Sequence, residues 1–171
     1  HKPAGIVCTT SKIDKNNVID YLNFPERIYP VGRLDKESTG LLLLTNNGQL
    51  MDDVLRGSNY HEKEYIVHVN KPITDSVLQA MAQGVPILDT ITRPCKIRRM
   101  GKDCFYITLT QGLNRQIRRM CEYFDYRVTS LKRIRIMNIE LGSLPVGKWR
   151  ELTPSEIKTL KNLAQNKGEA E

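Results

Sequence analysis

Residues 32–40, GRLDKESTG, place an arginine and an aspartate, Arg33 and Asp35, in a glycine-led turn directly before four consecutive leucines, residues 41–44. Such an apolar run is typical of a buried strand, so the turn should lie against the protein interior. An ionised carboxylate at this place is costly unless it is paired with a cation or used in chemistry. Asp35 is therefore the first candidate for a catalytic group, and it requires a cationic partner.

The segment NRQIRRMCEYF, residues 114–124, can supply that partner. Its apolar residues recur at helical spacing, and Asn114 is a candidate N-cap. With Ile117 at the centre of the apolar face, Arg118 lies about 100° away, at the flank, where its side chain can turn inward. Arg115 and Arg119 should face solvent or phosphate. We expect Arg118 to pair with Asp35.

A third segment, KEYIVHVN at residues 63–70, alternates in the manner of a strand and presents Tyr65 as a half-buried aromatic. Taken singly, each candidate has an ordinary structural explanation. Asp35 could stabilise an Asx turn, Tyr65 could fill a strand face, and Arg118 could be a surface charge. Only their combination favours a functional site.

The positive charge of the chain is concentrated in one region of the sequence. The chain has 26 Lys and Arg residues against 19 Asp and Glu, a net charge of +7, whereas residues 93–135 alone carry twelve basic and three acidic residues. A basic region in an otherwise near-neutral protein favours a polyanionic partner. Nucleic acid is a better candidate than a membrane, because no basic amphipathic helix carries Trp or Phe anchors and no apolar run could span a bilayer.

The cysteines show neither the spacing of a metal site nor that of a disulfide framework. We expect reduced thiols, no metal and a cytoplasmic location.

The expected elements interleave strands and helices without a regular βαβ period. Strands are predicted at 5–10, 27–35, 40–45, 63–70, 95–100, 104–110 and 129–141, and helices at 15–23, 49–56, 74–84, 114–124 and 153–165. This order indicates an α+β fold with a mixed, largely antiparallel sheet flanked by helices. One domain is expected over residues 1–163, with possible lobes at 1–59 and 60–163 and a disordered tail at 164–171.

Three blocks, GRLDKESTGLLLLT, KEYIV and NRQIRRM, together with the opening HKPAG, resemble the sequence blocks of the RsuA-type ribosomal RNA pseudouridine synthases. The resemblance extends from HKPAG to LTPSEI, nearly the whole chain. It implies a pseudouridine synthase-like catalytic domain with a central cleft. It also implies isomerisation of a specific uridine in ribosomal RNA, with 23S large-subunit RNA as the expected substrate, without cofactor or metal. The family usually has a small N-terminal RNA-binding domain, which would precede His1.

The resemblance also assigns roles. Asp35 resembles the catalytic aspartate, Tyr65 the aromatic residue that stacks on the flipped base, Arg118 the basic partner of the aspartate, and Arg33 an arginine that approaches the RNA. Further candidates for contacts to the RNA backbone are Arg115, Arg119, Lys132, Arg133 and Arg135. One departure from the family pattern is Gln111-Gly112, where an acidic residue before the glycine is expected.

The sequence leaves alternatives open. Asp35 could act as a nucleophile at C1′ or C6 of the nucleotide, or as a base that takes a proton beside C1′. At the level of function, a monomeric uridine isomerase competes with a catalytically silent RNA-binding module and with a hydrolase that uses two carboxylates. A pure RNA binder has no use for a carboxylate among arginines. A hydrolase lacks a second acidic residue suitably placed beside Asp35, because Glu37 is expected to point elsewhere.

Overall fold

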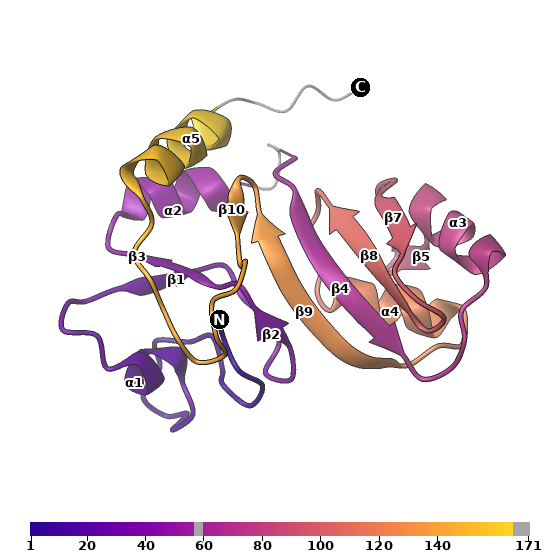
Figure 1. Ribbon diagram of the computed structural model, residues 1–171, viewed down its shortest axis with the longest axis horizontal. Coiled ribbons are helices and arrows are strands. Elements are labelled where there is room, and N and C mark those ends of the chain that lie inside the picture. The colour runs from indigo at the N-terminus through magenta and orange to yellow at the C-terminus, as the bar shows by residue number, and fades with distance from the viewer. Residues whose placement is uncertain (57–59, 166–171) are drawn as a thin grey trace.

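The computed structural model describes residues 1–56 and 60–165, which form two lobes joined by a central sheet (Figure 1). Three long strands dominate this sheet, namely β4 (Lys63–Val69), β8 (Cys104–Leu109) and β9 (Val128–Ile136). Together with β7 (Lys96–Arg99) and β10 (Ile139–Glu140) they follow the order β10-β9-β4-β8-β7, with all neighbours antiparallel. The short β2 (Thr39–Gly40) adds a parallel pairing to β9. The predicted mixed, largely antiparallel α+β fold is confirmed.

Two helices cover one face of this sheet in the C-terminal lobe. They are α3 (Asp75–Gln83), whose N-cap Thr74 accepts a hydrogen bond from the backbone of Val77, and α4 (Gln116–Tyr123). Their apolar residues pack with Val67, Phe105 and Ile107, which the alternation of β4 and β8 directs to the same side. A small pairing of β5 (Pro86–Ile87) with β6 (Thr90–Ile91) follows α3. This core fixes α4 against the sheet.

The N-terminal lobe is built on a two-stranded antiparallel sheet of β1 (Tyr29–Val31) and β3 (Leu43–Thr45). Around it lie α1 (Val18–Leu22), α2 (Gly48–Leu55) and α5 (Pro154–Gln165), with α2 and α5 side by side (Figure 1). Asn17 and Asn47 cap α1 and α2 with their side-chain oxygens.

The lobes are not the contiguous halves 1–59 and 60–163 that the sequence suggested. Ile136, Ile139 and Leu160 pack with Val31 and residues 41 and 43 in the N-terminal lobe, because the chain returns there after β9. The predicted tail also starts too early, since α5 continues to Gln165 and buries the side chain of Ala164. The rest of that predicted tail, residues 166–171, lies outside the described residues.

Three predicted strands differ in detail. Residues 5–10 form only an isolated bridge between Val7 and Asn17. The leucine run is divided, because the chain pairs with β9 at Gly40 and with β1 from Leu43 onward. The expected strand 129–141 is two strands, separated by a turn in which Met137 has a φ of 53°.

Gly40 allows the two lobes to approach closely. Its φ is 109°, and a Cβ at this position would lie 2.6 Å from the backbone nitrogen of Arg133. Only glycine fits this backbone contact, which attaches the segment after the Asp35 turn to the central sheet.

Candidate active site

Asp35 lies in a tight turn that is anchored on both sides. The backbone N–H of Ser38 donates to the carbonyl oxygen of Asp35 at 3.0 Å, and Leu34 and Ser38 are both buried. The buried ammonium group of Lys2 donates to the carbonyl oxygens of Lys36, at 3.2 Å, and Ser38, at 2.8 Å. The Asp35 side chain itself is 29% exposed. Hydrogen bonds to its backbone thus hold the turn in place, while the carboxylate of Asp35 remains accessible to solvent.

Arg118 reaches this turn from α4, as predicted from its position on the helix. Its Nε donates to Asp35 Oδ2 at 3.2 Å, and its Nη2 donates to Ser38 Oγ at 2.9 Å. The arginine side chain is only 12% exposed. The planar guanidinium group therefore holds the carboxylate and the neighbouring hydroxyl in a fixed relative position.

Arg115 is a second cation at the same carboxylate, which differs from the expectation that it faces solvent freely. Its Nη1 lies 3.6 Å from Asp35 Oδ2 and 3.4 Å from Glu37 Oε1. Arg115 adopts the left-handed conformation, with φ 50° and ψ 38°, at the start of α4. This conformation is uncommon for a residue with a side chain. The prediction that Asn114 caps α4 is wrong, because its carbonyl and side-chain oxygens accept hydrogen bonds from Arg119 instead.

The two oxygens of Asp35 differ in their surroundings. The closest approach of both guanidinium groups is to Oδ2, whereas Oδ1 accepts no hydrogen bond from any residue that the structure describes. One oxygen therefore fixes the carboxylate, and the other is available to a bound molecule. Glu37, beside Arg115, has its pKa lowered by a hydrogen bond from its own backbone N–H and by the charges of Arg115 and Arg118.

Tyr65 lies in β4 and packs between the two lobes. Its ring contacts the core of the C-terminal lobe and the smaller apolar cluster that contains Leu34, the residue directly before Asp35. Its hydroxyl group makes no hydrogen bond within residues 1–56 and 60–165. The aromatic ring is thus held beside the Asp35 turn with a polar group that is still available.

Lys63 was not among the predicted site residues. It lies two positions before Tyr65 on the same face of β4. Burial lowers the pKa of its ammonium group, and the nearby charge of Arg133 lowers it further. Ser38 was also missed, although it belongs to the same short segment as Asp35.

The remaining basic candidates do not share one surface. Arg133 is only 2% exposed and its Nε donates to the carbonyl oxygen of Leu41 at 2.8 Å, so its predicted place on an exposed basic surface is wrong. The structural reason is its place inside the sheet, where it is directly opposite Tyr65 of β4 and also pairs with Gly40 of β2.

Lys132 and Arg135 point to the other face of the sheet, since they are opposite Ile66 and Glu64 and not opposite Tyr65. Arg135 is already in ion pairs with Glu62 at 3.6 Å and with Glu64 at 3.3 Å. Arg33 and Arg115 are exposed and Arg119 is partly exposed. Arg115 is the N-cap of α4 and lies beside Asp35, Arg119 follows one helical turn later, and Arg33 belongs to the Asp35 segment.

Residues 1–56 and 60–165 contain no group of three or more His, Cys, Asp or Glu residues that could hold a metal ion. The same residues include no helix of the length and apolar character that crossing a membrane requires.

The arrangement of these residues is that of a known protein family. The model of the RNA pseudouridylate synthase family matches residues 1–123, which include the Asp35 turn, β4 and the α4 arginines. The chain belongs to this family. The chain is 53% identical over 165 residues to the "Dual-specificity RNA pseudouridine synthase RluF" of Salmonella typhi, and the match covers 96% of the chain and 57% of the relative.

Two further similar proteins are more distant. The chain is 34% identical to the "Ribosomal large subunit pseudouridine synthase B" of Bacillus subtilis over 97% of its length and 71% of the relative. A solved structure titled "Crystal structure of pseudouridylate synthase" superposes with a TM-score of 0.85 at 31% identity, covering 93% of this chain and 70% of that one. The fold expected from the resemblance is confirmed. The chain spans somewhat more than half the length of the RluF relatives.

Proposed function

We propose that the protein isomerises a specific uridine of ribosomal RNA to pseudouridine, with RNA of the large subunit as its substrate. Membership of the family supports the reaction type. Two relatives, named as an RNA pseudouridine synthase and a ribosomal large subunit pseudouridine synthase, support the substrate class. A ribosomal RNA substrate also fits a cytoplasmic enzyme that acts as a monomer.

The observation that supports the proposal is the way in which the Asp35 carboxylate is held and exposed. Its Oδ2 lies 3.2 Å from Arg118 Nε, its Oδ1 accepts no hydrogen bond from the described residues, and the side chain is partly exposed beside Tyr65. A carboxylate held in this way has a fixed orientation, and one of its oxygens can reach a substrate atom. A module that only binds RNA has no use for this arrangement, because the negative charge of Asp35 would repel phosphate.

The reaction requires no atom to be gained or lost. The bond between N1 of uracil and C1′ breaks, the base turns, C5 bonds to C1′, and the proton lost from C5 is balanced by the proton gained at N1. Asp35 could attack C1′ or C6 as a nucleophile, or remove a proton beside C1′ as a base. In each case the carboxylate must be held in position, and the hydrogen bond from Arg118 does this.

The target base must leave its stack before Asp35 can reach the glycosidic bond, at a cost of a few kcal/mol. Stacking on an aromatic side chain returns about 1–3 kcal/mol per base. Tyr65 is placed to supply this stacking, and its free hydroxyl could take part in the proton transfer at C5. Arg33, exposed in the segment that leads to Asp35, would occupy the space left by the base or bind its phosphate.

Contacts to the RNA backbone are assigned to Arg33, Arg115 and Arg119. Arg115 must release part of its interaction with Glu37 to bind phosphate, and Arg119 extends the same end of α4. We leave Arg133 out of this set because it is buried.

The proposal is tested with ribosomal RNA that lacks modification. The protein, Asp35→Asn and the control Glu37→Gln are incubated with the RNA, and pseudouridine is mapped by chemical labelling and primer extension. We expect product from the protein and from the control, and a rate at least about 10³-fold lower for Asp35→Asn, within the range for loss of a catalytic acid or base. Product formed by Asp35→Asn at the normal rate would exclude the catalytic assignment. RNA binding by the unaltered protein without any product would favour the silent RNA-binding module.

A further inference from the structure

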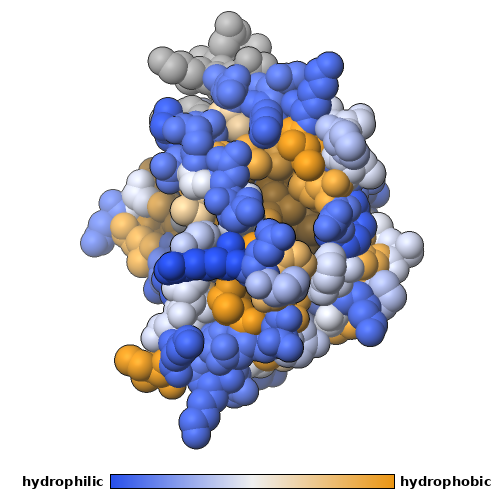
Figure 2. All heavy atoms as spheres, turned by 90° about the vertical axis from the view of Figure 1, so that its left-hand side faces the viewer, coloured by the Kyte–Doolittle hydropathy of each residue, from blue (hydrophilic) through white to orange (hydrophobic). Residues whose placement is uncertain are grey.

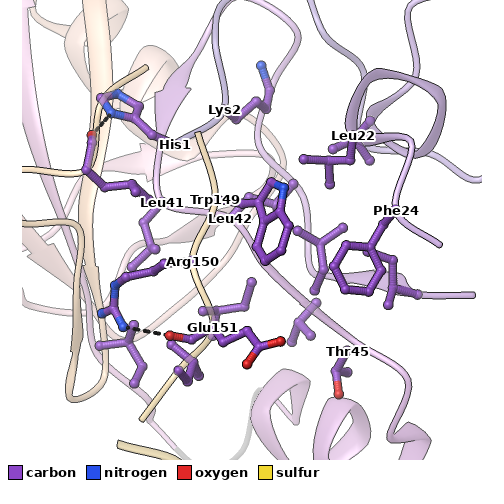
Figure 3. A pocket seen from close by; sticks show the side chains of 18 of the residues that line it. His1, Lys2, Leu22, Phe24, Leu41, Leu42, Thr45, Trp149, Arg150 and Glu151 are labelled. Atoms are coloured by element: carbon purple, nitrogen blue, oxygen red, sulfur yellow. Dashed lines mark hydrogen bonds between the residues drawn. The ribbon is translucent and has the colours of Figure 1, made fainter. Parts of the chain in front are cut away.

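An apolar groove opens beside Leu44 in the N-terminal lobe, away from the site described above. Its volume is about 510 Å³, and Figure 2 shows a hollow with apolar side chains at its base and polar residues around its rim. The rings of Phe24 and Trp149 meet edge to face at 5.1 Å in its lining (Figure 3). Because neither Asp35 nor Tyr65 lines this groove, a uracil base bound in it could not react at Asp35. The reacting base must therefore bind along β4, the strand that carries Tyr65.

Tyr65 shares one face of β4 with Lys63. In the regular pairing with β8, Lys63 is directly opposite Leu109 and Tyr65 is directly opposite Ile107. Leu109 and Ile107 both belong to the core that packs against α4. Side chains directly opposite one another share a face, so Lys63 lies on the same side of the sheet as Tyr65 and α4. Two positions along a strand are about 6.6 Å apart, which is comparable to the length of a lysine side chain.

The ammonium group of Lys63 has no protein partner within residues 1–56 and 60–165. It donates no hydrogen bond there and is in no ion pair. The neighbouring carboxylate of Glu64 belongs to the other face, where it pairs with Arg135 at 3.3 Å. Lys63 is half-buried, and a partly desolvated ammonium group without an acceptor is costly. A bound molecule could supply the missing acceptor.

Arg133 places a second unpaired charge on this face. It is directly opposite Tyr65 in β9, is 2% exposed and forms no ion pair with the described part of the chain. Its Nη2 is buried without a hydrogen-bond partner there. Arg133 lies close enough to Lys63 for its charge to add to the effect of burial in lowering the pKa of the lysine. The two cations therefore create a positive potential beside the ring of Tyr65.

The proposed isomerisation creates a negative charge that such a potential stabilises. When the N1–C1′ bond breaks, its electron pair stays with the base and is delocalised through C6 and C5 to O4. Attack at C6 also places the charge on O4, and so does removal of the proton from C5 after the new bond has formed. O4 therefore becomes more negative in each of the routes open to Asp35. A donor aimed at an atom where charge develops lowers the barrier of the reaction.

We propose that Lys63 is a further catalytic residue whose ammonium group donates a hydrogen bond to O4 of the flipped uracil and stabilises the charge that develops there. The inference rests on the proposed function, because it requires a uracil stacked on Tyr65. Lys63 keeps its proton throughout, so the balance of protons between C5 and N1 is unchanged. Arg133 is too buried to contact the base and contributes only its charge.

A carbonyl oxygen of the base is favoured over a phosphate as the partner of Lys63. The lysine is half-buried, with apolar neighbours on both sides, Leu109 of β8 and Ile136 of β9. A phosphate is strongly hydrated and is better bound by exposed cations. A planar base stacked on Tyr65 can bring one edge to Lys63 and lose little hydration, because base edges are uncharged before the reaction.

Single-turnover rates with unmodified ribosomal RNA test the proposal. Lys63→Met removes the charge at similar volume and should lower the rate at saturating protein by about 10²- to 10³-fold, the range for loss of one donor to a developing oxyanion. Lys63→Arg retains a charged donor and should recover at least about tenfold of this loss. The dissociation constant of the RNA should change by less than about threefold, since the contact strengthens only as the charge develops. Lys96→Met is the control, because the Lys96 side chain is 84% exposed.

The outcomes separate this inference from the proposed function. An unchanged rate for Lys63→Met would overturn the inference and leave the proposed function intact. Weaker RNA binding with an unchanged rate at saturation would assign Lys63 to a phosphate and overturn it as well. Absence of product from the unaltered protein would refute the proposed function, and this inference with it.

Thermal unfolding distinguishes a catalytic role from a structural one. Because Lys63 is charged, half-buried and unpaired, Lys63→Met should leave Tm unchanged or raise it while the rate falls. A clear fall in Tm would mark Lys63 as a residue that holds the two lobes together, and would overturn the inference.

RNA with one sulfur atom in place of oxygen identifies the atom that Lys63 contacts. The target uridine, once mapped, is replaced by 4-thiouridine or, as the control, by 2-thiouridine. Sulfur accepts hydrogen bonds weakly, so 4-thiouridine should slow the unaltered protein at least about fivefold more than it slows Lys63→Met. The control 2-thiouridine should slow both proteins by the same factor. Equal effects of 4-thiouridine on both proteins would overturn the contact to O4.

Discussion

Arg118 Nε lies 3.2 Å from Asp35 Oδ2 although 83 positions separate the two residues in the sequence. The arginine belongs to α4 of the C-terminal lobe, and the aspartate belongs to a turn of the N-terminal lobe. Their hydrogen bond therefore links the lobes at the candidate catalytic carboxylate. A second hydrogen bond, from Arg118 Nη2 to Ser38 Oγ at 2.9 Å, fixes the orientation of the guanidinium group at this contact.

Arg118→Lys should reduce turnover by about 10- to 100-fold, as expected for loss of an oriented hydrogen bond to a charged group. A lysine keeps the charge but cannot bind Asp35 and Ser38 with one planar group. The measurement is the single-turnover rate of pseudouridine formation. Arg119→Lys, one position along the helix and without contact to Asp35, serves as the control. Equal rates for the two variants would contradict the role given to Arg118.

Tyr65→Phe should retain RNA binding and lose turnover. Phenylalanine stacks as well as tyrosine, so the dissociation constant of the RNA should change less than about threefold, whereas removal of a proton-transfer group lowers the rate by about 10²-fold or more. Filter binding and single-turnover rates measure the two properties separately. An unchanged rate would limit Tyr65 to stacking.

RNA binding should weaken as the salt concentration rises. If Arg33, Arg115 and Arg119 each contact one phosphate, the logarithm of the association constant should fall against log[salt] with a slope of about −2, at about −0.7 per contact. Arg119→Gln should make the slope shallower by about 0.7. Arg135→Gln should leave it unchanged, because Arg135 lies on the other sheet face and is paired with Glu62 and Glu64. A larger effect from Arg135→Gln would show that the RNA extends over that face.

Lys2→Met should lower Tm by about 5–10 °C, because it removes charged hydrogen bonds to the carbonyl oxygens of Pro3, Lys36 and Ser38 in a buried position. Turnover should fall as well, since Lys36 and Ser38 flank the Asp35 turn. Lys12→Met, at an exposed position, is the control for loss of a lysine. Thermal unfolding followed by circular dichroism measures the effect, and equal Tm values for both variants would refute it.

Glu156 gives the fold a dependence on acid pH. Hydrogen bonds from Arg150 and from the backbone N–H of Thr153 lower its pKa from 4.5 to about 2. Because the pKa is lower in the folded state, this stabilisation is fully present above about pH 4.5 and decreases as the pH falls toward 2.

Glu156→Gln should therefore lower Tm by about 2–4 °C at pH 7, as expected for a weakened cap in a protein of this size. The difference should become smaller as the pH is lowered from 5 toward 2. Glu151→Gln is the control, since Glu151 is exposed and its carboxylate is in no ion pair among the described residues. A difference that does not vary with pH would show that the charge of Glu156 is not its cause.

The sequence by itself determined the fold class and most of the elements, and it predicted the contact between Arg118 and Asp35. Helical spacing placed Arg118 at the flank of α4, and burial of the turn before the leucine run required a cation for Asp35. Both inferences depend on local periodicity and on the cost of an unpaired charge, which need no coordinates.

The tertiary structure alone decided where the other basic residues lie. Arg133 and Arg135 are two positions apart in β9, yet they lie on opposite faces because the register against β4 shifts between them. Arg133 is buried beside β2, whereas Arg135 is in ion pairs on the other face. The left-handed conformation that brings Arg115 to Asp35 has no signal in the sequence. The groove beside Leu44 likewise depends on contacts between segments far apart in the chain, and such contacts arise only when the chain has folded.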